Sequence, residues 1–172
     1  MLKWLTRLAA TGIAVVVLSA PVAQASNGGD DEDVNDGLGA VRHATDAFHS
    51  LEASYKAGYA PLLACFDQTG PGGGGMGQHL VKGSLLDATV VPTQPEGLVY
   101  EIRGDRLKLV AVEYIVPFTA VPSTSNPPHL FGRAFFKNTT LQLWALHAWI
   151  WRSNPMGTFA NYNPNVRLCP GH

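Results

Sequence analysis

The sequence predicts an α+β domain, in which one long N-terminal helix packs on a curved, mainly antiparallel β-sheet or partial barrel. Apolar residues recur at three- and four-residue steps over residues 38–57, which is typical of an amphipathic helix. Two β-rich runs flank Gly104-Asp105 within residues 98–118, and a third β-rich run covers residues 141–152. One helix followed mostly by strands indicates the α+β class.

The first residues have the features of a secretory signal. Lys3 and Arg7 precede an apolar segment that is too short for a mature membrane helix, and residues 23–25 (Ala-Gln-Ala) match a small-x-small cleavage pattern. No other stretch approaches the roughly 20 apolar residues that a membrane span needs. We therefore expect a signal peptide at residues 1–25, cleavage near Ala25, and export to the periplasm or the extracellular space, with no membrane segment in the mature form.

Residues 26–37 (SNGGDDEDVNDG) are small and acidic and lack apolar periodicity, which predicts a disordered leader. The full chain has a net charge of −1, and loss of residues 1–25 removes two basic residues and no acidic one. This acidity, and the lack of a basic patch interleaved with aromatic residues, exclude a nucleic-acid surface. The remaining residues 38–172 suit a single domain.

The predicted helix at residues 38–57 has one apolar face, made by Val41, Ala44, Phe48, Leu51 and Tyr55. Gly58 and Pro61 are stop signals after it. The chain has two cysteines, Cys65 and Cys169. In an exported protein they are expected to form a disulfide, because the alternative of a redox pair normally uses a C-x-x-C arrangement.

Gly104-Asp105 predicts a two-residue hairpin turn. The turn sets a register of four facing pairs: Arg103 with Arg106, Ile102 with Leu107, Glu101 with Lys108, and Tyr100 with Leu109. The opposite charges of Glu101 and Lys108 favour this register. After the third β-rich run, two Asn-Pro steps exclude a helix.

Three polar residues lie in apolar surroundings. Successive strand residues alternate between faces, and both faces of residues 107–117 are apolar apart from Glu113 in the middle. His147 is likewise the lone polar residue on its face of residues 141–151, and His79 lies in a short strand that follows the glycine-rich loop at residues 70–75. An unpaired buried carboxylate costs several kcal/mol, so Glu113 requires a proton, a hydrogen bond or a cation.

We therefore predict a metal site formed by His79, Glu113 and His147. Two imidazoles and one carboxylate, with one position left open, are the ligand set of catalytic zinc and non-haem iron sites, which points to a divalent Zn, Cu or Fe ion and a small ligand beside it. His129 is a candidate fourth ligand, and Tyr114 and Trp149 would shape the apolar shell.

Other readings of the same residues remain open at this level. Glu113 and His147 can form a buried hydrogen-bonded pair with no chemistry, or a general acid/base pair without a metal. No G-x-S-x-G motif occurs, so nucleophilic catalysis is disfavoured. A metal-free module would instead hold an apolar ligand or a protein partner in an aromatic pocket made by Trp144, Trp149, Trp151, Phe131 and Phe135.

Five motifs are distinctive when taken together: GMGQHLV, PEGLVYE, LVAVEYIVP, PPHLFG and LHAWIWRSNPMGTFANYNPNVRLC. Over residues 55–169 they resemble a family of small exported bacterial proteins of unknown function, so the resemblance implies export but no particular activity. Its motif positions are occupied here by His79, Glu113, His129, His147, Asn154, Pro155 and Cys169. Leu-Val-Lys-Gly follows His79, where the family pattern has an aromatic residue and an asparagine, so ligand affinity is expected to differ if that asparagine binds a ligand.

Overall fold

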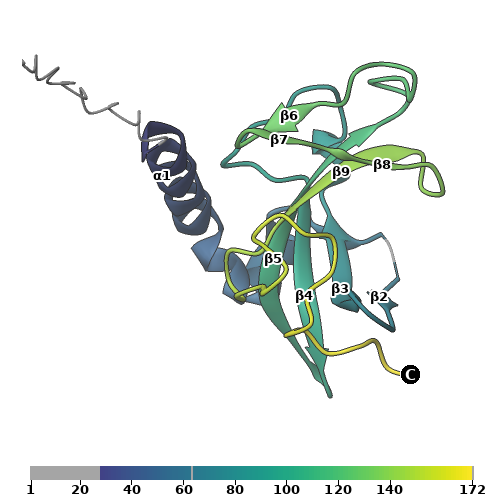
Figure 1. Cartoon of the computed structure of the whole chain (residues 1–172). Helices are drawn as coiled ribbons and strands as arrows, with labels where there is room; N and C mark the ends of the chain where they lie inside the picture. The colour runs from purple at the N-terminus through teal and green to yellow at the C-terminus, as the bar shows by residue number, and fades with distance from the viewer. Residues whose placement is uncertain (1–27, 63, 172) are drawn as a thin grey trace, which may run out of the picture.

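The computed structural model describes residues 28–62 and 64–171 (Figure 1). The predicted signal peptide at residues 1–25 lies outside these described residues. Within them, no helix combines the length and the apolar character that a membrane crossing requires.

The N-terminal helix differs from the prediction at both ends. α1 spans Gly28–Thr45, so most of the acidic segment predicted as a disordered leader is helical. Acidic side chains near a helix N-terminus interact favourably with the helix dipole, an effect that the leader interpretation overlooked. The predicted continuation to residue 57 is interrupted by a 3-10 turn, η1 (Asp46–His49), and resumes as α2 (Leu51–Lys56).

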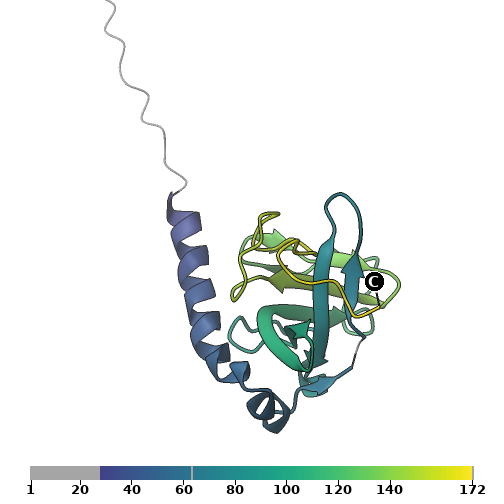
Figure 2. The same ribbon diagram turned by 90° about the horizontal axis from the view of Figure 1, so that it is seen from below.

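Ser50 explains this interruption. It has an extended backbone, and its hydroxyl accepts a hydrogen bond from the backbone N–H of Ala53 at 3.3 Å, which makes it the N-cap of α2. The buried Thr45 hydroxyl donates to the carbonyl of Val41 at 2.8 Å at the end of α1. Figure 2 shows the resulting turn, with α1 running beside the strands and the short helix turned beneath them.

The strands form a seven-stranded antiparallel sheet in the order β1-β3-β4-β5-β9-β8, with β2 paired to β3 outside that path. This confirms the predicted α+β class, and the sheet does not close into a barrel. Its strands are β1 (Ala60–Pro61), β2 (Phe66–Gln68), β3 (Gly74–Val81), β4 (Gly97–Arg103), β5 (Arg106–Pro117), β8 (Phe136–Asn138) and β9 (Leu143–Ala148). The small elements outside it are the 3-10 turn η2 (Gly83–Leu85) and the pair β6 (His129–Leu130) and β7 (Arg133–Ala134).

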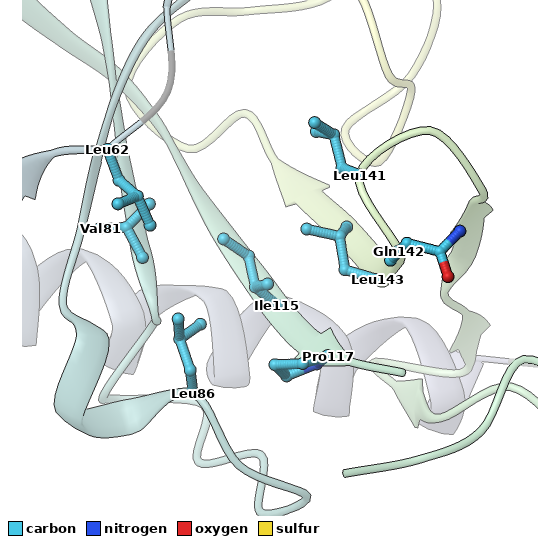
Figure 3. A pocket seen from close by; sticks show the side chains of 8 residues that line it. All are labelled: Leu62, Val81, Leu86, Ile115, Pro117, Leu141, Gln142 and Leu143. Carbon is cyan, nitrogen blue, oxygen red and sulfur yellow. The ribbon is translucent and has the colours of Figure 1, made fainter. Parts of the chain in front are cut away.

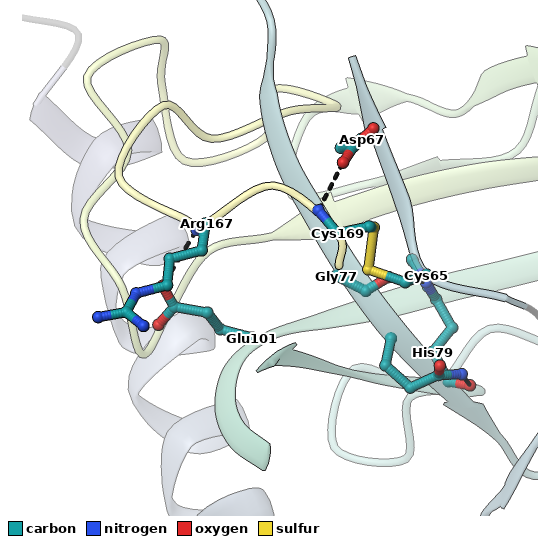
Figure 4. The surroundings of a disulfide bond; sticks show 8 residues. Cys65, Asp67, Gly77, His79, Glu101, Arg167 and Cys169 are labelled. Carbon is teal, nitrogen blue, oxygen red and sulfur yellow. Dashed lines mark hydrogen bonds between the residues drawn. A yellow bond between two sulfur atoms is a disulfide. The ribbon is translucent and has the colours of Figure 1, made fainter. Parts of the chain in front are cut away.

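The β4–β5 hairpin has the predicted register at all four facing pairs. The opposite charges of Glu101 and Lys108 nevertheless do not pair with each other. Glu101 is buried, and its carboxylate accepts hydrogen bonds from Arg103 Nε at 2.6 Å and from the backbone N–H of Arg167 at 3.0 Å (Figure 4), whereas Lys108 is exposed. The turn residues, rather than the cross-strand charges, account for the register.

The predicted strand at residues 141–152 is shorter in the structure, where β9 ends at Ala148. The backbone N–H of Trp149 bonds to the carbonyl of Thr158, which lies on the C-terminal segment and not on a strand of the sheet. The chain therefore leaves the sheet at this point and turns back over it.

β5 is a central strand, as predicted, and it is buried from Leu109 to Val116. The face of the sheet toward the helices forms the larger core, which includes Leu38, Val41, Leu98, Tyr100, Val112, Tyr114 and Leu146. A smaller apolar cluster comprises Val99, Val110, Ala111, Trp149 and Val166. The predicted metal site lies with this smaller cluster.

The Cys65–Cys169 disulfide is present, as predicted. Beside it, the backbone N–H of Cys169 donates to Asp67 Oδ2 at 2.5 Å (Figure 4). Further back along the C-terminal segment, Gly75 on β3 exchanges backbone hydrogen bonds with Asn163 and Val166. The segment is thus fastened to β2 and β3, next to the strand residue His79.

Candidate metal centre

The structure brings His79, Glu113 and His147 together from β3, β5 and β9. One potential ligand atom from each residue lies within 4.8 Å of the others. Glu113 Oε2 is 3.5 Å from His79 Nε2, Glu113 Oε1 is 3.5 Å from His147 Nε2, and the two Nε2 atoms are 3.4 Å apart. All three side chains are buried, with Glu113 the most exposed residue at 6%.

Strand register accounts for the meeting of Glu113 and His147. The two residues lie directly opposite each other on the neighbouring antiparallel strands β5 and β9. Side chains at facing positions project from the same side of a sheet with Cβ atoms about 5 Å apart. Each therefore supplies the other with a polar neighbour on an apolar face.

Gly97 allows the third residue to join them. β4 lies between β3 and β5, and Gly97 on β4 is the residue opposite Glu113. A Cβ atom at Gly97 would lie 3.1 Å from Glu113 Cβ and 3.4 Å from Glu113 Oε2. Because glycine has no side chain, the space above β4 beside Glu113 stays open. His79 faces the next inward residue of β4, Val99, and its Nε2 reaches the Glu113 carboxylate from there. Gly97 was not predicted from the sequence, although a glycine inside a strand signals such a close approach.

The pairwise separations between the imidazole nitrogens and the nearest carboxylate oxygens are longer than ordinary hydrogen bonds and close to the spacing of atoms that bind one ion, and one atom from each residue lies within 4.8 Å of the others. Strong hydrogen bonds between these atom types are about 2.7–3.2 Å long. By contrast, ligand atoms of a tetrahedral zinc ion with bonds of about 2.0–2.1 Å lie roughly 3.3–3.4 Å apart. The carboxylate presents one oxygen to each imidazole nitrogen, so the three side chains surround a point instead of bonding to one another.

The environment of each imidazole orients its Nε2 atom. His79 Nδ1 is 3.1 Å from the carbonyl oxygen of Gly77, and donation of an Nδ1 proton there leaves Nε2 with a free lone pair. His147 stacks on Trp149, with ring centroids 5.8 Å apart and planes at 12°. The Trp149 indole N–H in turn bonds to the carbonyl of Ala160 at 2.6 Å. Two backbone carbonyls therefore help to fix the site, one directly and one through Trp149.

Burial keeps all three groups uncharged in the metal-free state. Desolvation lowers the pKa of His79 to about 4, and desolvation together with His79 lowers the pKa of His147 to about 3. Desolvation, with a smaller effect of Glu96, raises the pKa of Glu113 to about 8. Near neutral pH the imidazoles are therefore available as ligands, and a cation would have to displace one proton from Glu113.

Two buried atoms of the site have no hydrogen-bond partner among the described residues: Glu113 Oε2 and His147 Nδ1. Unsatisfied buried polar atoms are rare because each costs about 1–3 kcal/mol. A cation next to Glu113 Oε2 would compensate that atom.

Of the three other predicted site residues, His129 and Tyr114 lie away from the group of three, and Trp149 lies against it. His129 is exposed on β6, its Nδ1 lies 2.9 Å from the carbonyl of Pro127, and it is not part of the three-residue group. Tyr114 belongs to the helix-side core, where its hydroxyl donates to the carbonyl of Pro92 at 2.7 Å. It cannot shape the shell of the site, because it projects from the face of β5 opposite to Glu113. Trp149 lies against His147, in the position expected for a shell residue.

The five aromatic residues of the alternative hypothesis fill the protein core and do not surround one pocket. Trp144 and Phe135 are buried in the helix-side core, with Phe131 and Trp151 packed against it. Trp149 belongs to the smaller cluster.

Glu96 is a second buried carboxyl group that the sequence analysis did not identify. Its Oε2 accepts a hydrogen bond from the backbone N–H of Ile115 at 3.0 Å, and burial raises its pKa to about 7. Burial, with a smaller effect of the nearby Glu96, raises the pKa of the Tyr59 and Tyr114 hydroxyls, which belong to the helix-side core. The position directly before Gly97 gives no periodicity signal, because it precedes the first residue of β4.

Two pockets lie near the group of three. One, of about 230 Å³, is formed by aliphatic side chains of β3, β5 and the start of β9, together with Leu62, Leu86 and Gln142 (Figure 3). The other, of about 330 Å³, is bordered by His147, by the apolar side chains Met76, Phe136 and Ala145, and by the polar side chains Gln68, Asn138, Asn161 and Tyr162.

Comparisons of the chain with family models, with curated proteins and with solved structures give no match. The resemblance noted from the sequence motifs therefore stays a prediction, and the site has to be interpreted from its own geometry.

Proposed function

We propose that this chain is an exported protein that binds one divalent metal ion through His79, Glu113 and His147, with zinc as the best fit. The observation that supports this most is the convergence of three buried side chains from three strands, each with one ligand atom within 4.8 Å of the other two. A four-coordinate ion with three protein ligands keeps one position for water or a small ligand.

A metal-free hydrogen-bonded cluster explains the site less well. In that arrangement a protonated Glu113 would donate from one oxygen to one imidazole and accept at the other oxygen from the N–H of the second imidazole. The 3.5 Å contacts are longer than such charge-neutral hydrogen bonds, and Glu113 Oε2 has no hydrogen-bond partner among the described residues. A bound cation satisfies the carboxylate and both Nε2 lone pairs together.

Two features support export. The first residues have the charge, apolar segment and cleavage pattern of a secretory signal. The Cys65–Cys169 disulfide is a bond that persists mainly in oxidising compartments. Export would also place the metal site where it meets ions and small molecules outside the cytoplasm.

The test is metal analysis of the protein purified from the periplasm or medium. Elemental mass spectrometry should find about one zinc per chain in the wild type after dialysis against zinc. His147→Ala should retain less than about a tenth of an equivalent, because it removes one of only three ligands. His129→Ala is the matched control, since it removes an exposed histidine outside the group. Equal zinc content in the wild type and in His147→Ala would refute the proposal.

A further inference from the structure

We propose that the aliphatic pocket beside the metal centre binds the hydrocarbon chain of a small aliphatic carboxylate, whose head group takes the open position at the ion. This inference rests on the proposed metal site. It names the class of ligand that the site would accept.

Strand register places two lining residues of this pocket, Val81 and Ile115, on the same face of the sheet as the ligands, although none of the three ligands itself lines the pocket. Val81 on β3 lies opposite Gly97 on β4, and Gly97 lies opposite Glu113 on β5. Val81 therefore borders the side-chain-free space above Gly97. A Cβ atom at Gly97 would lie 3.4 Å from Glu113 Oε2, so the same space also adjoins the carboxylate. Val81 is also one of the residues that line the pocket.

Ile115 forms the other side of this connection. It follows Glu113 by two positions on β5, so its side chain projects from the same face about 6.5 Å further along the strand. Ile115 also lines the pocket, and it is buried like Val81. The inner wall of the pocket thus continues from the metal centre along two strands.

The lining selects a hydrocarbon. Seven of its side chains are apolar, namely Leu62, Val81, Leu86, Ile115, Pro117, Leu141 and Leu143, and Gln142 is the single polar one (Figure 3). The volume of about 230 Å³ accommodates roughly seven non-hydrogen atoms at about 30 Å³ each. That is the size of a short unbranched or once-branched chain.

Charge selects the head group. A divalent ion held by one carboxylate and two neutral imidazoles leaves a net charge of +1 in buried surroundings. A monoanion at the open position neutralises this charge, and a buried charge is stable only when it is paired. No acidic side chain of the described residues lines the pocket, so nothing there repels a carboxylate.

The second pocket suits this ligand less well. Of the three ligands it touches His147 alone. Three of its eight lining residues are apolar (Met76, Phe136 and Ala145), whereas the other five carry amide, imidazole or phenol groups, so its wall suits a hydrocarbon less well than a lining with a single polar residue. It serves instead as an internal control for substitutions.

The experiment uses the full protein loaded with Co²⁺, whose visible absorption responds to the ligand in the fourth position. Hexanoate, acetate and hexanamide are titrated separately. We expect hexanoate to bind at least roughly tenfold more tightly than acetate, because each buried methylene contributes about fourfold. Hexanamide, which has the same chain without the charge, should leave the spectrum unchanged.

Two variants that fill the aliphatic pocket and one control variant locate the binding. Leu141→Trp fills the aliphatic pocket and should weaken hexanoate binding at least roughly tenfold, without changing the cobalt content or acetate binding. Leu62→Trp is a second filling variant at a residue that is 62% exposed, so it tests the same point with little risk to folding. Asn161→Trp fills the other pocket and should leave hexanoate binding unchanged.

The outcomes separate this inference from the proposed function. Equal affinities for hexanoate and acetate, equal binding of hexanamide, or loss of hexanoate binding in Asn161→Trp alone would overturn the inference while the metal site stands. A chain that takes up no cobalt, zinc or other divalent ion would overturn both.

Discussion

The two faces of the sheet differ in the kind of buried polar group that they leave without a hydrogen-bond partner. On the helix side the hydroxyls of Tyr59, Tyr100 and Tyr114 each have a partner at 2.7 Å, a carbonyl oxygen of Pro95, Phe48 and Pro92 respectively. On the other face Glu113 Oε2 and His147 Nδ1 are buried without a partner among the described residues. The helix side also leaves one such atom among the described residues, the indole nitrogen of Trp151, which is a neutral donor that binds no metal. The unpartnered carboxylate oxygen lies instead beside two imidazoles, which indicates that the second face is built for a ligand.

The largest effect should come from the helix-side face. Leu98 is fully buried there, and Leu98→Ala removes apolar contacts and leaves a cavity. We expect the free energy of unfolding to fall by about 2–5 kcal/mol, as measured by urea denaturation. Zinc affinity of the folded variant should stay within a factor of about three, because the substitution lies on the face away from the site. A large change in zinc affinity would show that the two faces are not independent.

Zinc should stabilise the protein through the site face alone. At a free zinc concentration about a hundred times the dissociation constant, the free energy of unfolding should rise by about 2.7 kcal/mol. The melting temperature of the wild type should therefore increase with zinc, whereas that of His147→Ala should not. An equal increase in both proteins would mean that zinc binds elsewhere.

The metal-free protein should lose stability as the pH rises from 6.5 to above 8. Burial raises the pKa of Glu113 to about 8, so the folded chain holds a proton that the unfolded chain has already released. Because the folded chain releases this proton only near pH 8, the free energy of unfolding should fall by about 1–2 kcal/mol over this range. Urea denaturation with chelator at pH 6.5 and 8.5 measures the loss, and Glu113→Gln should reduce it.

The imidazoles act at lower pH and with the opposite sign. Burial lowers the pKa of His79 to about 4 and of His147 to about 3, so the unfolded chain binds protons below pH 6.5 that the folded chain does not. They therefore reduce stability as the pH falls through that range. A metal-free protein whose stability is the same at pH 6.5 and 8.5 would contradict the assigned protonation state of Glu113.

The smallest predicted effect comes from Gly97, whose missing side chain leaves space beside Glu113. Gly97→Ala places a Cβ atom 3.1 Å from Glu113 Cβ, which should displace the carboxylate and weaken zinc binding about tenfold. Competition with a fluorescent zinc chelator measures the change. Gly39→Ala is the matched control, because a Cβ there meets nothing within 4 Å and alanine favours the helix. Unchanged zinc affinity in Gly97→Ala would show that the space left by Gly97 is not needed for metal binding.

Local sequence signals predicted the parts of the structure that depend on local geometry. The turn at Gly104-Asp105 predicted the hairpin register. The alternation of side chains identified Glu113 and His147 as polar residues on apolar faces of two strands, which pair with each other in the sheet. Both rules act within a few residues. The cysteine pair was also predictable, since only two cysteines occur.

The remaining features depend on contacts between distant segments. His79 reaches Glu113 across β4, where Val99 faces His79 and Gly97 faces Glu113. The order of the strands that brings these residues together cannot be inferred from any one of the segments. His129 lies on the separate β6–β7 pair, so its distance from the site could not be inferred from spacing. Tyr114 is different, because the same alternation rule should have excluded it.

X-ray absorption at the zinc edge of the zinc-loaded protein tests the central claim most directly. Zinc held by His79, Glu113 and His147 predicts a four-coordinate ion with nitrogen and oxygen neighbours at about 2.0–2.1 Å and outer-shell scattering from two imidazole rings. The scattering from one ring should disappear in His79→Ala if that protein still retains zinc. A spectrum with sulfur at about 2.3 Å, or with oxygen neighbours and no imidazole scattering, would contradict the account.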